Sequence, residues 1–397
     1  MRFLQNFVLV VASITQLASA RGQPLKSRQI QSLSNALSQY ADLSTFNSLI
    51  NSQPSILGNI TTGSDHKVTL LAPTNDAITN FLRQSNISDV TLLPADRLLA
   101  ILQYHTLDAG LTTTNFSAPR GITVPTKLRD TIYNLRSPGP AIINQYGDEA
   151  QGQVLFVSQD TINPAKFRVR QDSSSDKKTA NLRAGLGQNA ELTALDGEWD
   201  GGYFHSIDAV LETPKPCSTT IRKLSDSLSS LADAFDKTKL WQTVDKLPNV
   251  TCLGPNAQAF NEAGSPEKSL GKDDLKNALL FHTLPQVTYT DFLTDGQEFT
   301  SYANVTVRVT IRGDEIWFND AKVVSPNVLT NNGLIHVLDR VMSANAAPPS
   351  PSSTTSPTGS STASPTSTST PPNAGNPVAG NLRVAAVVAL AVGVLIA

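Results

Sequence analysis

The feature that most constrains this chain is an internal repeat. Three short blocks occur twice in the same order, with matching apolar, proline and histidine positions: residues 71–78 with 253–260, 104–107 with 281–284, and 204–210 with 335–341. Self-similarity of this kind marks a structural unit that is used more than once. We therefore predict two domains that share one fold. The first copy carries about 46 extra residues between its second and third blocks, which we place within about 137–200.

Local patterns indicate that each copy combines helices with strands. After Pro94, apolar residues and a histidine recur at helical spacing, and the second copy repeats the pattern. The residues are Leu98, Ile101, Leu102 and His105 in the first copy, and Leu275, Ala278, Leu279 and His282 in the second. Residues 305–312 instead alternate apolar and polar side chains, the period of a half-buried strand.

At the repeated blocks the chain resembles the fasciclin domain family. Residues 69–75 resemble the strand, turn and helix that open such a domain, and residues 319–324 and 333–341 resemble its end. The resemblance implies an α+β fold of two tandem fasciclin-like domains, each a β-sandwich-like wedge with a helical layer. It also implies an adhesive role at the cell surface. The two domains are expected over residues 24–213 and 214–345.

Both ends of the chain indicate the secretory route. Residues 1–20 join a basic start, an apolar run and an Ala-Ser-Ala end, the pattern of a signal peptide. The apolar run 384–397 is shorter than the roughly 20 residues that a membrane-spanning helix needs. It follows small residues and a short spacer, so residues 373–397 read as a glycosylphosphatidylinositol attachment signal. We predict lipid attachment at Asn373, with Gly375 as the weaker choice and a marginal membrane anchor as the alternative.

Several features predict covalent modification of the secreted chain. Residues 346–372 are almost entirely Ser, Thr and Pro, a composition typical of an O-glycosylated stalk. Cys217 and Cys252 are predicted to form a disulfide in the oxidising compartment, with two buried thiols as the alternative. Five sequons mark candidate N-glycosylation sites, at Asn59, Asn86, Asn115, Asn249 and Asn304.

Two groups of residues are candidates for binding. His105 and His282 lie on apolar helix faces, which favours core histidines that are satisfied by hydrogen bonds. The family resemblance offers another interpretation, because a fasciclin Tyr-His pair has been associated with adhesion to integrin-like receptors and Tyr104 with His105 matches it.

The second group is Arg312-Gly313-Asp314, the tripeptide that integrins recognise in extracellular ligands. It lies between the strand predicted to end at Ile311 and a further apolar run, where Gly-Asp is also an ordinary two-residue hairpin turn. Turn chemistry and integrin binding therefore both stay open, and the second requires a host that has integrins.

Catalytic chemistry has little support. His205 with Asp208, and His336 with Asp339, are three residues apart on predicted strands, which places their side chains on opposite faces. The sequence also has no nucleophile elbow, zinc-protease helix or phosphate loop. Residues 196–201 resemble the start of a calcium loop, but its twelfth position is apolar. We predict a protein that is not an enzyme and needs no cofactor or metal.

The charge balance narrows the class of partner. The chain has 31 basic and 33 acidic residues and no basic stripe, which argues against nucleic acid. The expected partners are cell-surface, matrix or cell-wall components, either protein or glycan, and the outer membrane leaflet through the lipid anchor. A structural cell-wall glycoprotein is the alternative to an adhesion module, and the stalk and anchor suggest a fungus by analogy.

Overall fold

The computed structural model describes residues 31–61, 67–158 and 179–349, and each repeat within them forms one sheet. The first sheet consists of β1 (Val68–Pro73), β2 (Thr106–Leu107), β3 (Ile122–Pro125), β4 (Val154–Ser158), β5 (Thr179–Arg183), β6 (Asn189–Trp199) and β7 (Gly202–Ile207). The second consists of β8 (Val250–Pro255), β9 (Thr283–Leu284), β10 (Glu298–Thr300), β11 (Thr306–Arg312), β12 (Glu315–Phe318), β13 (Ala321–Thr330) and β14 (Gly333–Leu338).

Both sheets have the same topology. The first has the order β2-β1-β7-β6-β5-β4-β3, and the second, taken from its β9 edge, has the order β9-β8-β14-β13-β12-β11-β10. Each strand of the first copy therefore has a counterpart in the second. In each copy the strand of the first block runs parallel to the strand of the third block, as β1 with β7 and as β8 with β14. The predicted duplication of one α+β fold is confirmed.

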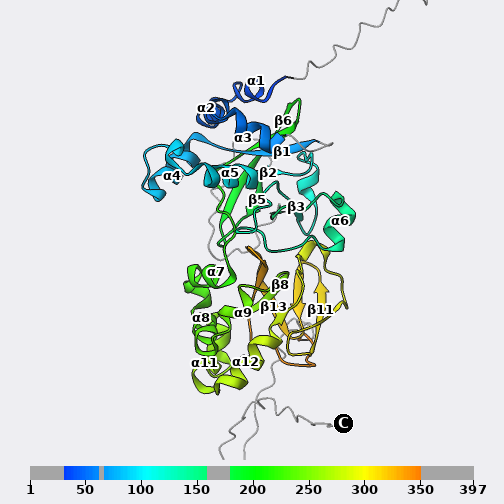
Figure 1. The fold of residues 1–397 in the computed structure, drawn as a ribbon. Coiled ribbons are helices and arrows are strands. Elements are labelled where there is room, and N and C mark those ends of the chain that lie inside the picture. The colour runs from blue at the N-terminus through cyan, green and yellow to red at the C-terminus, as the bar shows by residue number, and fades with distance from the viewer. Residues whose placement is uncertain (1–30, 62–66, 159–178, 350–397) are drawn as a thin grey trace, which may run out of the picture. The chain divides into compact units, whose positions relative to one another are not determined.

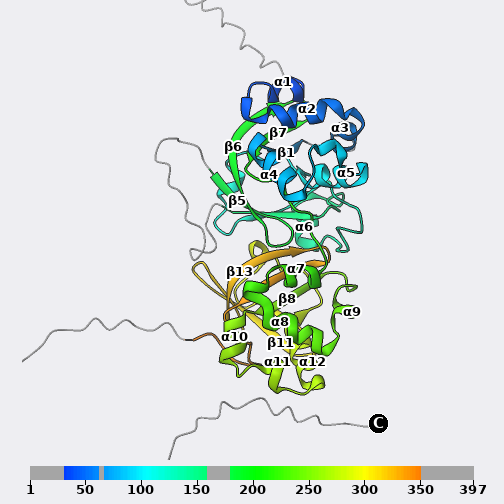
Figure 2. The ribbon, with the colours of Figure 1, turned by 90° about the vertical axis from the view of Figure 1, so that its left-hand side faces the viewer.

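Helices precede or connect these strands. In the first copy they are α1 (Leu33–Leu37), η1 (Ala41–Leu43), α2 (Ser44–Ser52), α3 (Pro54–Thr61), α4 (Asn75–Ser85), η2 (Val90–Leu92), α5 (Ala95–Tyr104), η3 (Asn115–Ser117) and α6 (Pro140–Tyr146). In the second they are α7 (Cys217–Lys223), α8 (Ser225–Thr238), α9 (Trp241–Val244), α10 (Ala257–Glu262), α11 (Pro266–Ser269), α12 (Lys272–Phe281) and η4 (Thr290–Phe292). Figure 1 shows α8, α11 and α12 together on one side of the second domain, and Figure 2 shows α1–α5 beside β1 and β7.

The first repeated block folds as a strand, a turn and a capped helix. In the first copy Thr74 ends the turn after β1, and its hydroxyl accepts a hydrogen bond from Ala77 N at 3.2 Å. In the second copy Asn256 takes this position, and its side chain accepts from Ala259 N at 2.7 Å. Because such caps satisfy an otherwise unpaired helix amide, they fix where α4 and α10 begin.

The third block requires glycine where its strand begins. A Cβ on Gly202 would lie 2.0 Å from Val68 O, and one on Gly333 would lie 1.9 Å from Val250 O. No side chain fits at these distances. The residue before Gly333 is Asn332, whose amide donates to two carbonyls of the second domain at 2.8 Å. The first copy has Gly201 there, so it lacks this polar anchor.

Each domain has two apolar clusters, because its central strands bury both faces. Leu70 packs in the cluster that contains the helices of the first domain, whereas the next residue, Leu71, packs in the cluster enclosed by the curved sheet. Cys252 and Leu253 divide in the same way in the second domain. Consecutive strand residues point to opposite faces, so this arrangement follows from strand geometry. The layered sheet and helices match the sandwich-like wedge that the sequence predicts.

The first copy is longer in two connections. Its β3–β4 connection spans residues 126–153 and contains α6, and its β4–β5 connection spans 159–178, which lies outside the described residues. Their counterparts in the second copy span only 301–305 and 313–314. Both longer connections overlap the range predicted for the insertion.

The two copies also contact each other. A small apolar cluster joins Ile142, Ala150 and Val154 of the first copy to Tyr289, Leu329 and Leu334 of the second. Polar contacts surround it, including Arg183 Nη1 to Ser325 Oγ at 2.8 Å. The described residues 31–61, 67–158 and 179–349 accordingly belong to one compact unit.

Several predicted features fall outside the described residues. These are the signal peptide, the stalk beyond residue 349, and the attachment signal with Asn373. Among the residues that the structure describes, no helix is both long enough and apolar enough to cross a membrane.

Candidate functional site

The two helix histidines predicted to lie in the core do so, and both accept a hydrogen bond from a distant segment. In each, Nδ1 contacts a carbonyl one turn back and Nε2 accepts from a backbone amide. The contacts are His105 Nδ1 to Ile101 O (2.7 Å), Leu211 N to His105 Nε2 (3.0 Å), His282 Nδ1 to Ala278 O (2.8 Å) and Met342 N to His282 Nε2 (2.9 Å). Because an amide can only donate, each ring is the neutral tautomer with its proton on Nδ1.

The two strand histidines use the opposite tautomer. The contacts are His205 Nε2 to Leu111 O (3.1 Å), Leu195 N to His205 Nδ1 (3.2 Å), His336 Nε2 to Thr288 O (2.8 Å) and Asn327 N to His336 Nδ1 (3.2 Å). Here the amide donates to Nδ1, so the proton is on Nε2. Burial lowers the pKa of His105, His282 and His336 to about 4 and also lowers the pKa of His205.

Tyr104 and His105 are fully buried, and adhesion to a receptor through this pair stays a prediction. Both have an exposed fraction of 0%. The Tyr104 hydroxyl donates to Val154 O at 3.1 Å, and burial raises its pKa well above the ordinary value. A partner could reach this pair only after the domain opened. The pair instead belongs to the core.

The strand carboxylates do not serve the neighbouring histidines. Asp208 accepts from Glu191 N at 2.7 Å, and Asp339 accepts from Lys322 N at 2.9 Å. Each carboxylate therefore bonds to the backbone of the neighbouring strand. This agrees with the spacing of three residues, which places the carboxylate and the histidine on opposite faces of their strand. Asp196, whose segment resembles the start of a calcium loop, lies in β6 and accepts from Thr113 N at 2.7 Å. The described part of the chain holds no cluster of three or more metal-ligating side chains.

Arg312, Gly313 and Asp314 form the hairpin turn between β11 and β12. Arg312 pairs with Glu315 across the turn, and Gly313 has φ +59°, which favours glycine at the first central position of such a turn. Gly313 and Asp314 are exposed. The Arg312 guanidinium donates to Pro349 O, so the start of the stalk passes beside the turn. Of the two predicted binding groups, this one lies at the surface.

The sequon asparagines in the described region lie at the ends of elements or in loops. Asn86, Asn115 and Asn304 are exposed, and Asn249 is half-buried with its side-chain oxygen accepting from Ser137 N at 2.8 Å. Asn59 lies in α3. Glycan attachment at these sites stays a prediction.

Cys217 and Cys252 are neighbours inside the second domain. Cys217 begins α7 and Cys252 lies in β8, and both are buried as thiols. A hydrogen bond between the two side chains, together with burial, raises the pKa of Cys217 well above its ordinary value. The predicted disulfide is therefore not formed in this structure, although its partners are in contact. Its formation in the oxidised protein stays a prediction.

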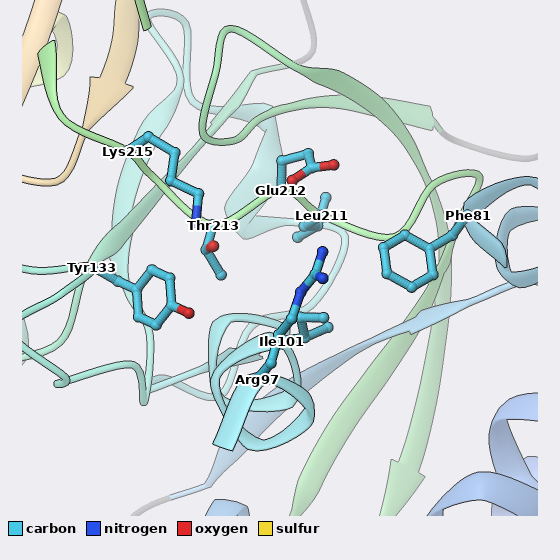
Figure 3. Close-up of a pocket in the computed structure, with 8 residues that line it drawn as sticks. All are labelled: Phe81, Arg97, Ile101, Tyr133, Leu211, Glu212, Thr213 and Lys215. Carbon is cyan, nitrogen blue, oxygen red and sulfur yellow. The ribbon is translucent and has the colours of Figure 1, made fainter. Parts of the chain in front are cut away.

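One pocket of the first domain involves residues that the sequence did not single out. Figure 3 shows its lining side chains, Phe81, Arg97, Ile101, Tyr133, Leu211, Glu212, Thr213 and Lys215. They come from α4, α5, the β3–β4 connection and the segment after β7. Since these segments are far apart in sequence, no local motif could have revealed the pocket.

Comparison with known proteins agrees with the duplicated fold. A model of the fasciclin domain matches residues 41–214 and 226–344. The chain belongs to the fasciclin domain family. It is 25% identical over 333 residues to a fasciclin-like arabinogalactan protein of Arthroderma benhamiae, covering 81% of this chain and 69% of the relative. It is also 25% identical over 317 residues to fasciclin-like arabinogalactan protein elcF of Phaeosphaeria nodorum, covering 79% and 89%.

Two further fasciclin proteins are similar to this chain. Human periostin is 27% identical over 150 residues, which cover 37% of this chain and 18% of periostin. The structure of a FAS1 domain pair from the insect cell adhesion molecule Fasciclin I aligns over 77% of this chain and 97% of that one. Its TM-score is 0.34 and its sequence identity 19%.

Proposed function

We propose that this chain is a secreted glycoprotein of the cell surface, and that its two fasciclin domains adhere to matrix or cell-wall components. Family membership over both repeats carries this proposal. The names of the similar fungal proteins identify them as arabinogalactan-type glycoproteins, which supports the same class here. The Ser/Thr/Pro stalk and the sequons add support from the sequence.

In the proposed protein, residues 1–20 are removed and a glycosylphosphatidylinositol lipid is attached at Asn373. The domains over 24–213 and 214–345 are then held away from the membrane by the stalk. Many anchored copies act together, because closely spaced weak sites raise the effective concentration of each binding partner.

An adhesive role also suits the chemistry of the domains better than a catalytic one. Their four buried histidines are neutral and bonded on both ring nitrogens, so none is poised to exchange protons with a substrate. In the Arg312-Gly313-Asp314 turn, Gly313 and Asp314 are exposed, so this is the predicted binding group that a protein partner could reach.

The competing proposal is a structural glycoprotein whose anchor remnant is transferred covalently to wall glycan. Treatment of intact cells with phosphatidylinositol-specific phospholipase C separates the two, with blots of both medium and pellet. Release into the medium supports the anchored adhesion protein. Retention until a wall glucanase is added supports the structural protein, and presence in the medium before any treatment shows that the anchor prediction is wrong.

A further inference from the structure

The pocket shown in Figure 3 combines positive charge with aromatic walls. Arg97 reaches it from α5 and Lys215 from the segment after β7, and Figure 3 shows the two side chains extending toward the space from different sides. Within the described part of the chain, neither forms an ion pair with an acidic side chain. Lys215 Nζ instead lies 4.9 Å from the centre of the Tyr133 ring. Two cations thus face one small volume with only Glu212 as an opposing charge.

The wall that carries Glu212 and Lys215 is held rigidly by backbone contacts. Leu211 N donates to His105, Glu212 N donates to Gln188 Oε1 at 2.7 Å, and Lys215 O accepts from Asn331 N at 2.9 Å. His105 is therefore a positioning residue for this wall. Because the wall is fixed before any ligand arrives, little ordering cost would oppose binding.

The second copy does not reproduce this charge. When the two copies are aligned through their histidine-bearing helices, Arg97 corresponds to Asp274. When they are aligned through their closing strands, Lys215 corresponds to Ala346. Tyr133 belongs to the longer β3–β4 connection of the first copy. The pocket is thus formed by the first domain together with Lys215, at the start of the range given to the second, and it is not part of the shared fold.

The size of the pocket limits what enters it. It encloses about 50 Å³, whereas a single water needs roughly 10–15 Å³. One carboxylate therefore fits inside the pocket. A sugar ring does not, so the ring that carries the carboxylate would stay at the mouth. Arg97 and Lys215 would hold the carboxylate through charge-assisted hydrogen bonds. The Phe81 and Tyr133 side chains can contact the apolar face of the attached ring. Glu212 and Thr213 offer acceptors to its hydroxyl groups.

We propose that this pocket binds the carboxylate of an acidic sugar residue, as found at the end of a uronate-containing matrix or wall polysaccharide. This inference rests on the proposed adhesive function and names its ligand class for the first domain. Glu212 and Thr213 favour a sugar over an acidic peptide, because a uronate carries hydroxyl donors beside its carboxylate and the side chain of an acidic peptide residue carries none.

The test measures binding of the purified, glycosylated full chain to trigalacturonate by titration calorimetry, with the neutral trisaccharide galactotriose and with triglutamate in parallel. We expect binding to trigalacturonate that weakens as salt is added. Arg97→Gln and Lys215→Gln should each weaken it by about tenfold or more, since each removes a charged partner. Lys276→Gln and Arg308→Gln remove exposed cations of the second domain and should leave it unchanged.

Equal binding of galactotriose, or equal effects of the pocket and control substitutions, would overturn the proposal. Equal or tighter binding of triglutamate would assign the pocket to an acidic peptide instead and reject the sugar. Because the measurement uses purified protein, a negative result leaves the cell-release experiment and the proposed surface role unaffected.

Discussion

At the scale of single residues, the duplicated histidines explain much of what the repeated blocks encode. Each domain buries one histidine at the end of a helix and one in its closing strand, and both act as neutral hydrogen-bond junctions between distant segments. The sequence predicts the first of these roles from helical spacing. The amides that donate to Nε2 of the two helix histidines lie at least 60 residues away along the chain, so only the structure identifies them.

The buried histidines should make the protein sensitive to acid. Their pKa is about 4 in the folded chain and 6.5 when exposed, so the unfolded state binds more protons between these values. Their contribution to stability is present above pH 6.5 and is lost as pH falls toward 4. Each of the three can contribute about 3 kcal/mol to this loss. Urea unfolding at a series of pH values should show the decline.

A single substitution tests whether a buried histidine causes this acid sensitivity. His282→Gln should reduce the pH dependence of the free energy of unfolding by about one proton, because one titrating group is removed. Thr283→Val removes a buried hydroxyl that does not titrate, so it serves as a comparison and should leave the slope unchanged. A His282 variant with the full wild-type slope would show that this ring does not cause the acid sensitivity.

At the scale of elements, the sequence predicts those whose period is local. The helix after Pro94 and the alternating strand are confirmed as α5 and β11. Periodicity did not show that α5 is buried on two faces. Leu98 and Ile101 face the helical cluster, whereas Ala100 and Tyr104 face the cluster enclosed by the sheet. That second face is why Tyr104 lies in the core and not at the surface.

The glycine that begins β14 should be indispensable. Gly333→Ala places a Cβ against Val250 O at 1.9 Å, which would force β14 away from β8. We expect a loss of about 3 kcal/mol or more in the free energy of unfolding, measured by denaturant titration. Gly271→Ala is a suitable control, since a Cβ there meets only Asp274 Oδ2 at 3.7 Å. Similar losses in both variants would mean that the strand tolerates the added carbon by shifting.

The cysteine pair links α7 to β8, and its redox state can be measured directly. We expect the secreted protein to show no free thiol when it is denatured without reductant, and two thiols after reduction. A disulfide closing this segment would stabilise the domain by about 4 kcal/mol on the chain-entropy model. Cys252→Ala should then lower the melting temperature of the oxidised protein far more than that of the reduced one. Two free thiols in the secreted chain would establish the alternative of a buried thiol pair.

At the scale of the whole molecule, the sequence predicts two domains but not how they meet. The pocket and the contact between the copies both combine residues from separate segments, and Tyr133, Ile142 and Ala150 among them lie in the longer β3–β4 connection of the first copy. Such connections follow no repeat and no period. Their side chains therefore give no signal before the fold brings them together.

The contact between the domains contains a half-buried aspartate. Asp291 of η4 accepts hydrogen bonds from Thr123 N and Thr123 Oγ1 of β3, both at 2.7 Å. Burial raises the pKa of Asp291 to about 6. The pH dependence of stability that comes from Asp291 has the opposite sign to that of the histidines. Stability from this carboxyl group is present below pH 3.8 and is lost as pH rises through 6. At neutral pH the two donors of Thr123 therefore compensate for an ionised, desolvated group.

Thr123→Val removes one of these donors with little change of shape and should weaken the domain contact in a pH-dependent way. Near pH 7 we expect a loss of about 1.5–3 kcal/mol, the range for a hydrogen bond to a charged group. Near pH 5 the loss should shrink, since Asp291 is then largely protonated and a bond between neutral groups contributes only about 1 kcal/mol. Thr283→Val is the matched control, because that hydroxyl donates to the neutral Leu279 O at 2.7 Å within one domain. Its cost should not change with pH, and hydrogen exchange at the residue 123 amide should rise only in the Thr123 variant. If both variants lose the same free energy at both pH values, the carboxylate of Asp291 does not control how the domains are joined.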